Sequence, residues 1–316
     1  MQPDLAHDQT DGANRASGAP YSEIARTAAG PIEYFTAGDG PVVLGFHGTP
    51  GGYDQIALVA ADVVAAGFRI VGWSRPGYLR TPLEVGRTPE QQADAAACLL
   101  DTLGVERVCV SGASGGGPSA YSFAARHPDR VWALIAECAI SKRFRDDLTA
   151  IQRAMMRMAM NDFTTGIIDW FAAHYPGAIA RQMVRIEGTL DRSGARALAA
   201  QIAADPAKQQ FVRGLIGTFS PLTLRKRGLL NDLEQFARID ALGLDQIRCP
   251  ALIIHGTNDD AVSFSHGEFA ARSIPGAEFI RVEGAPHLLW ISQEATELAR
   301  RRIDFLRRHG PRQPDK

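Results

Sequence analysis

The chain has 316 residues, long enough for one large core with a sizeable insertion, and it carries 34 basic against 35 acidic residues. This near-neutral balance excludes a strong field for nucleic acid or for an anionic membrane surface. We therefore expect a small-molecule substrate, no nucleic-acid partner and no membrane partner, while the oligomeric state stays open.

The N-terminal residues 1–20 are rich in Asp, Gln, Gly, Ala and Ser and have no apolar segment after a basic start. This composition predicts a disordered leader and not a secretory signal. No window of the chain approaches 18 unbroken apolar residues, so no membrane span is expected.

Four cysteines are widely spaced and form no C-x-x-C pair: Cys98, Cys109, Cys138 and Cys249. Three of them lie in apolar runs, which favours buried thiols in a reducing cytoplasm over a zinc site. We therefore expect a cytoplasmic protein without a metal.

The first part of the chain alternates between strand-like and helix-like patterns. Residues 30–36 alternate like an exposed edge strand, and residues 42–46 form the continuous apolar run of a strand that is buried on both faces. Helical spacing follows over 54–66, then comes a strand at 68–73 and a helix from Thr88 to Gly104 with a capping Thr and an early Pro.

A small, Gly-rich loop, His47-Gly48-Thr49-Pro50-Gly51-Gly52, follows the strand at 42–46. Such a loop lets backbone amides approach a ligand closely. The N–H of Thr49 is a candidate oxyanion donor, because Pro50 has no N–H to give. A plain turn is the alternative interpretation.

The apolar run 108–110 leads into a G-x-S-x-G motif formed by Gly112, Ser114 and Gly116, and a helical pattern follows. A sharp strand-to-helix turn strains the residue at its apex and requires small neighbours two positions away on each side. The turn would expose the Ser114 hydroxyl as a nucleophile and aim the N–H of Gly115 at a bound oxygen. The alternative is a Gly-rich turn that binds phosphate or only packs closely, but no Lys-Ser/Thr pair follows, so the motif is not a P-loop.

After a buried strand at 131–138 the strand–helix rhythm stops, and about a hundred residues show helical periodicity with no convincing strand. The expected helices are 148–159, 167–174, 178–186, 193–204 and 209–219. The methionines at 155, 156, 158 and 160 suit core packing or an adaptable apolar wall around a ligand.

The alternation of strand and helix patterns resumes after the insertion. It predicts strands at 251–256 and 278–282 and helices at 267–274 and 291–309. The sequence therefore predicts an α/β fold, with a mostly parallel central sheet flanked by helices and an inserted helical cap. We expect the core to comprise residues 21–140 and 243–310 and the cap residues 141–242.

Ser114, Asp259 and His287 each fall in a loop directly after a predicted parallel strand, and such loops share one edge of a sheet. A serine hydroxyl becomes nucleophilic when an imidazole takes its proton, and a carboxylate must hold that imidazole in the right tautomer. These three residues suit the roles of nucleophile, orienting acid and base.

Other residues compete for these roles. Asp260 is adjacent to Asp259 but should point the other way, and Glu137 ends a strand at the same edge. His47 and His255 each precede a Gly in a tight turn, where a hydrogen-bonding structural role is favoured. His127 caps a helix end, and His174 lies in the insertion.

In these motifs the chain resembles the α/β-hydrolase fold family, in particular its cap-bearing branch with esterases, C–C bond hydrolases, proline iminopeptidases and epoxide hydrolases. The matching segments are 47–51, 75–78, 112–116, 256–259 with Val262, and 286–287. The resemblance implies a covalent acyl-enzyme on serine, hydrolysed by water without a cofactor. Pro286 and Arg75 depart from the family pattern, which often has Gly before the histidine and Asp before the Pro-Gly pair.

We expect a serine hydrolase of a small, largely apolar carboxylic ester. Proline iminopeptidase activity is an alternative, because the loop at 47–52 looks like that of the group. Acidic residues would have to hold the substrate amino group, and Glu187, Asp191 and Asp205 could do so or could simply be solvated. C–C bond hydrolysis on the same triad is a second alternative, whereas epoxide and haloalkane hydrolysis need a carboxylate nucleophile. A non-catalytic receptor for a small apolar ligand is the alternative from a different class.

Overall fold

The computed structural model describes residues 20–144, 161–175, 177, 182 and 192–311. Eight strands form one sheet in the order β1-β2-β4-β3-β5-β6-β7-β8. Only the pairs β1/β2 and β2/β4 are antiparallel, so the sheet is mostly parallel, as predicted. The strands are β1 (Glu23–Thr27), β2 (Gly30–Ala37), β3 (Val42–Phe46), β4 (Arg69–Trp73), β5 (Val108–Ala113), β6 (Val131–Glu137), β7 (Ala251–Gly256) and β8 (Glu278–Val282).

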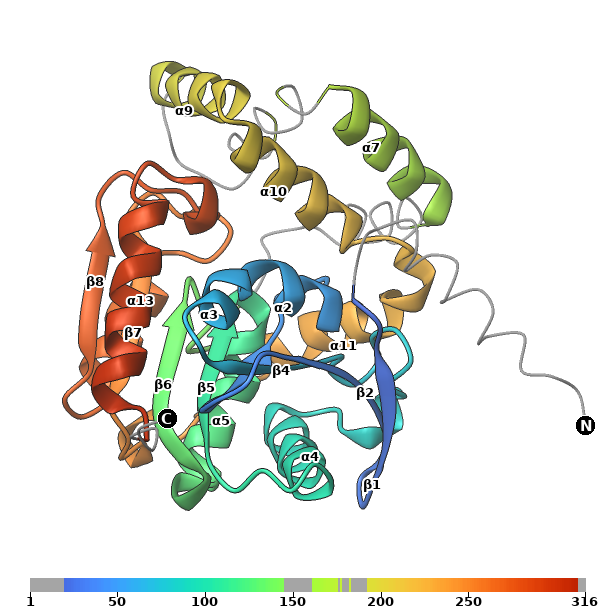
Figure 1. The fold of residues 1–316 in the computed structure, drawn as a ribbon, viewed down its shortest axis with the longest axis vertical. Coiled ribbons are helices and arrows are strands. Elements are labelled where there is room, and N and C mark those ends of the chain that lie inside the picture. Colours follow the sequence, from blue (N-terminus) through green and yellow to red (C-terminus); the bar gives the residue numbers. More distant parts are fainter. Residues whose placement is uncertain (1–19, 145–160, 176, 178–181, 183–191, 312–316) are drawn as a thin grey trace, which may run out of the picture.

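Helices cover both faces of this sheet (Figure 1). Neighbouring residues of each central strand enter different core clusters, since Val43 faces one side and Leu44 the other. This is why the central strands read as unbroken apolar runs. On one face lie α2 (Tyr53–Val59), α3 (Ala61–Ala65) and α13 (Ala295–His309); on the other lie α4 (Pro89–Thr102), α5 (Gly117–Arg126) and α12 (Ser265–Ser273).

Two expectations about the first strands and helices were wrong. Strand β1, which the pattern did not reveal, pairs with β2 and takes the sheet edge, so Ile32 and Phe35 of β2 are buried. The helix expected over 54–66 is two helices, α2 and α3, separated at Ala60. By contrast, the predicted cap of α4 is present, because Thr88 and Gln91 form a reciprocal capping box.

Between residues 141 and 242 the described residues contain helices and no strand. They are α7 (Asp162–His174), α9 (Arg192–Ala204), α10 (Pro206–Gly217) and α11 (Lys226–Phe236). In Figure 1, α7, α9 and α10 lie beyond the carboxyl ends of the strands. Helix α11 was not predicted, whereas the expected helix at 148–159, most of the one at 178–186, and the leader except residue 20 lie outside the described residues.

The described helices include none that is both long and apolar enough to cross a bilayer.

Candidate active site

Ser114 is at the apex of the sharp turn between β5 and α5, and its φ of 51° lies in the left-handed region. The turn is possible because its flanking glycines leave room. A Cβ on Gly112 would lie 2.6 Å from the Cβ of Ala120, and one on Gly116 would collide with the carbonyl oxygen of Phe46. The strain at Ser114 is therefore held by close packing on both sides.

The loops that follow β5, β7 and β8 bring Ser114, Asp259 and His287 together. The Nε2 atom of His287 lies 3.0 Å from the Oγ of Ser114, and its Nδ1 lies 2.8 Å from Oδ2 of Asp259. A carboxylate that accepts from Nδ1–H leaves Nε2 as the acceptor of the serine proton. The geometry suits proton transfer from the hydroxyl to the imidazole, and the catalytic roles themselves stay predictions.

The carboxylate of Asp259 is fully buried and has a hydrogen-bond partner on each oxygen. Its Oδ1 accepts from the N–H of Val262 at 2.8 Å, and its Oδ2 lies 3.2 Å from Nε2 of His255. Burial would raise the pKa of Asp259, but His287 and His255 outweigh this effect and hold the pKa well below its usual value. Asp259 therefore stays ionised at neutral pH, whereas Asp260 is exposed to solvent.

The ligand-type atoms of Cys138, His255 and Asp259 lie within 4.8 Å of one another. Two of the three already have other partners. Oδ2 of Asp259 lies 2.8 Å from Nδ1 of His287. Nε2 of His255 is already 2.8 Å from the carbonyl oxygen of Val262. Cys138 and His255 instead form hydrogen bonds with the candidate acid Asp259.

The two predicted oxyanion donors, Thr49 and Gly115, are direct neighbours. A Cβ on Gly115 would collide with the Thr49 side chain, so only glycine lets the two segments approach this closely. No acceptor among the described residues takes the N–H of Thr49. The loop is held from below by Gln55, whose Oε1 accepts from the N–H of Gly48 at 2.7 Å and whose Nε2 donates to the carbonyl of Pro50 at 3.1 Å.

A buried ion pair beside this loop was missed by the sequence reasoning. Arg75 of the β4 loop contacts Asp232 of α11 at 2.6 Å, and both side chains are nearly inaccessible to solvent. The only hint of this ion pair in the sequence was that Arg75 stands where the family pattern often has Asp. Its partner could not be found because α11 itself was not predicted.

The competing residues have other partners. Glu137 accepts from Arg302 at 2.8 and 2.9 Å in the core. Nε2 of the buried His47 accepts from the N–H of Arg75 at 3.0 Å, and burial lowers its pKa well below the usual value, so it is neutral. The other partners are Asp94 for His127 and the Trp170 carbonyl for His174.

Of the three acidic residues considered for an aminopeptidase, only Asp205 is described. Its carboxylate caps α10 by accepting from the N–H groups of Ala207 and Lys208. Glu187 and Asp191 lie outside the described residues.

A cavity of about 240 Å³ opens on Ser114 and His287. Its walls are mostly apolar, and the described residues that line it include no Asp, Glu, Lys or Arg. The walls come from the core and from the insertion, with Ile56, Ile140, Leu215, Leu233, Phe236 and Trp290 among them. The volume is small for a ligand site and suits a compact, uncharged molecule.

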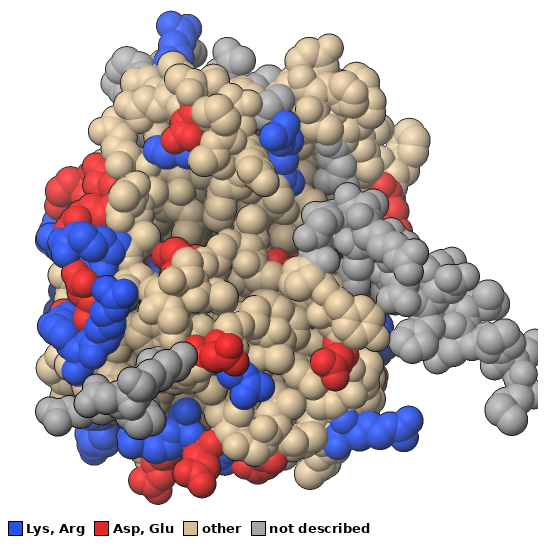
Figure 2. Space-filling view, in the orientation of Figure 1, with Lys and Arg blue, Asp and Glu red and all other residues tan. Residues whose placement is uncertain are grey.

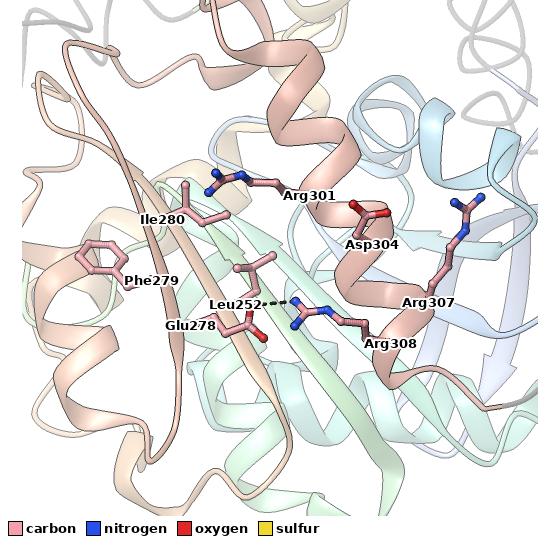
Figure 3. Close-up of a pocket in the computed structure, with 8 residues that line it drawn as sticks. All are labelled: Leu252, Glu278, Phe279, Ile280, Arg301, Asp304, Arg307 and Arg308. Atoms are coloured by element: carbon pink, nitrogen blue, oxygen red, sulfur yellow. Dashed lines mark hydrogen bonds and ion pairs between the residues drawn. The ribbon is translucent and has the colours of Figure 1, made fainter.

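A larger groove of about 760 Å³ lies between β8 and α13 (Figure 3). Most of its charged side chains are held in ion pairs. Arg308 contacts Glu278 across the groove at 2.8 Å, and Arg301 contacts Glu297, which lies outside the lining, at 3.0 Å. In Figure 2, basic and acidic groups are interspersed along the side of the molecule where α13 and β8 lie in Figure 1. No nucleophile and base lie together among its lining residues, so chemistry favours the smaller cavity over the larger one.

A family model described as the alpha/beta hydrolase fold matches residues 41–293, so the chain belongs to the α/β hydrolase family. An "Alpha/beta hydrolase fold protein" from Nakamurella multipartita has a similar structure, with a TM-score of 0.84, 38% identity, and coverage of 91% of this chain and 99% of that chain. The "Uncharacterized hydrolase YcgS" of Bacillus subtilis (strain 168) is 28% identical over 88% of this chain and 95% of its own length.

A pimeloyl-[acyl-carrier protein] methyl ester esterase of Chromobacterium violaceum is 29% identical over 82% of this chain and 92% of its own length. The predicted family, the fold class and the assignment as an esterase-like hydrolase are thereby confirmed.

Proposed function

We propose that this hydrolase cleaves a small, uncharged and largely apolar carboxylic ester through an acyl-enzyme on Ser114. The observation that carries the proposal is the 3.0 Å contact between Ser114 Oγ and His287 Nε2 at the mouth of an apolar cavity. The esterase relative supports an ester over other acyl compounds. A small-molecule substrate is the only partner that this site requires.

In the proposed reaction the Oγ of Ser114 attacks the ester carbonyl carbon while its proton passes to Nε2 of His287. The N–H groups of Thr49 and Gly115 stabilise the negative oxygen of the tetrahedral intermediate. The intermediate collapses as the C–O bond to the alcohol breaks, and the leaving oxygen takes the proton from His287. Water then attacks the acyl carbonyl carbon while His287 takes its proton. The bond from this carbon to the Oγ of Ser114 breaks, and His287 returns the proton to Oγ, which releases the acid and restores Ser114.

The lining of the cavity separates this proposal from its alternatives. A proline iminopeptidase needs a carboxylate for the substrate amino group, and a C–C hydrolase of an unsaturated keto acid needs a cation for the substrate carboxylate. The described lining offers neither charge. A binding protein without catalysis needs no aligned nucleophile, base and acid.

The test is labelling with a fluorophosphonate probe, with the modified residue located by mass spectrometry, together with turnover of p-nitrophenyl acetate and proline β-naphthylamide. We expect Ser114 to be labelled and the ester to be cleaved much faster than the amide. The variant Ser114→Ala should lose both labelling and turnover while keeping its circular dichroism spectrum. Ester hydrolysis that persists in this variant, or a wild-type protein that never reacts with the probe, would overturn the proposal.

We also infer a reducing compartment, consistent with a cytoplasmic protein. The four cysteines are free thiols, and burial raises the pKa of Cys109 and Cys138 well above the usual value. Buried thiols with raised pKa values are unreactive.

A further inference from the structure

The hydroxyl of Thr49 does not point to a substrate but into a buried carboxylate. Its Oγ1 donates to Oδ2 of Asp232 at 2.5 Å and accepts from Nη2 of Arg75 at 3.1 Å. The two partners are 183 residues and 26 residues away in sequence. The side chain of this loop residue is thus fixed from outside the loop.

Asp232 is itself held rigidly. Arg75 donates to Oδ1 at 2.9 Å and to Oδ2 at 2.6 Å, which is the two-pronged geometry of a strong pair, and the hydroxyl of Tyr78 donates to Oδ2 at 2.6 Å. Burial raises the pKa of Tyr78 and Asp232 raises it further, so the phenol keeps its proton as a donor. Burial works against the charge of Arg75, but Asp232 outweighs this and raises its pKa, so the guanidinium stays charged.

Helix α11 contacts both candidate donors from one face. Asp232 and Phe236 are four residues apart, so they lie on the same side of the helix. Asp232 binds Thr49, while a Cβ on Gly115 would lie only 3.0 Å from the Phe236 ring. The last described helix of the insertion therefore packs directly against both halves of the oxyanion hole.

We propose that Asp232, held by Arg75, is a positioning residue of the oxyanion hole, because its bond to the Thr49 hydroxyl aims the Thr49 N–H at the reacting carbonyl oxygen. Helix α11 then has two roles: it completes the catalytic site, and it forms part of the cavity wall. This inference rests on the proposed function, since it needs an oxyanion to stabilise.

The size of the effect follows from oxyanion geometry. A donor must lie about 2.7–3.1 Å from the oxyanion, and losing one donor reduces kcat by about 100- to 1,000-fold. A donor that is present but loosely aimed loses part of this factor, so a loss of about tenfold or more in kcat is expected. Because the oxyanion forms only after substrate binding, KM should change by no more than about threefold.

The matched pair Thr49→Val and Thr49→Ser tests the proposal with p-nitrophenyl acetate. Valine keeps the shape of threonine and loses the hydroxyl, whereas serine keeps the hydroxyl. Turnover is expressed per Ser114 that reacts to completion with a fluorophosphonate, so that a loss of folded protein does not count as a loss of rate. We expect kcat to fall about tenfold or more in Thr49→Val and less than about threefold in Thr49→Ser.

Asp232→Asn is expected to lower kcat in the same way, with a matched decrease in the affinity of a boronic acid that mimics the tetrahedral intermediate. Glu137→Gln removes another buried, Arg-paired carboxylate and should leave kcat per labelled site unchanged. If Asp232→Asn does not fold, the Thr49 pair decides alone. Equal kcat values for the two Thr49 variants in an active enzyme would overturn this inference only, whereas a wild-type protein without labelling or turnover would overturn the proposed function.

Discussion

Asp259 and Asp260 are consecutive in the chain, yet the carboxylate of Asp259 is fully buried against His287 at 2.8 Å while Asp260 faces solvent. The short turn after β7 directs the first side chain into the site and the second away from it. Two residues of the same chemistry thus provide a natural comparison for the role of the acid.

We expect Asp259→Asn to lower kcat by about 1,000- to 10,000-fold, because an amide cannot fix the required imidazole tautomer. Asp260→Asn should stay within about twofold of the wild type. Steady-state hydrolysis of an aryl acetate by both variants measures the difference. Comparable losses in the two variants would mean that the acid has been assigned to the wrong residue.

Gly115→Ala should impair catalysis without unfolding the protein. Its new Cβ would collide with the Thr49 side chain and push apart the two candidate oxyanion donors, so we expect kcat to fall by about 10- to 100-fold. Gly166→Ala is the control, because no described residue beyond its chain neighbours and its own helix backbone lies within 4 Å of the added methyl group. In α7 this change should keep full activity and stabilise the helix by about 0.5–1 kcal/mol. An unimpaired Gly115→Ala enzyme would show that the contact is unimportant for turnover.

The small cavity predicts a preference for short acyl chains. Values of kcat/KM for p-nitrophenyl esters should decrease once the acyl group outgrows about 240 Å³. Leu233 lines the cavity, so Leu233→Ala should raise the hexanoate-to-acetate ratio by about tenfold, as expected for two buried methylenes at about 0.8 kcal/mol each. Leu103→Ala, which shortens a half-buried leucine that packs against the core away from the lining, should leave the ratio unchanged. A ratio that moves equally in both variants would rule out this wall as the limit.

Stability should decrease in mild acid because of His266. Burial, helped by Lys142 and His255, lowers the pKa of this imidazole from 6.5 to about 4. Between these values the unfolded chain binds a proton that the folded chain does not, so the free energy of unfolding is fully retained above about pH 6.5 and falls below it, by at most about 1.4 kcal/mol per pH unit.

Urea unfolding at several pH values between neutrality and about pH 5 measures this loss. His266→Asn should flatten the pH dependence, because its side-chain oxygen can replace Nδ1 as the acceptor of the Ser141 N–H. An unchanged slope would place the responsible group elsewhere, for example at the buried His47.

The sequence allowed the prediction of the parts of the fold that local patterns encode. Apolar runs located the central strands, and the G-x-S-x-G turn located Ser114, since both depend on neighbouring residues. Strand β1 has a mixed exposure pattern, so nothing in its own letters separated it from the polar leader.

Helix α11 and the Arg75–Asp232 ion pair show more clearly what could not be predicted from the sequence. The helix begins after Arg225 without a side-chain cap, and its residue Asp232 looks like any solvated acid until folding places it beside Arg75, 157 residues away in sequence. Long-range charge pairing of this kind leaves no local signature.

The residues of the candidate site follow both central strands and an edge strand of the sheet. Ser114 and the Thr49 loop follow β5 and β3, which are paired in register. His287 follows β8, which pairs with a single strand, β7, among the described residues. Backbone amides of β8 should therefore exchange with deuterium sooner than those of β5 on warming. The loop that carries His287 should then lose its structure while the turn that carries Ser114 is still folded. We therefore expect thermal inactivation below the temperature of global unfolding, with recovery of activity on cooling.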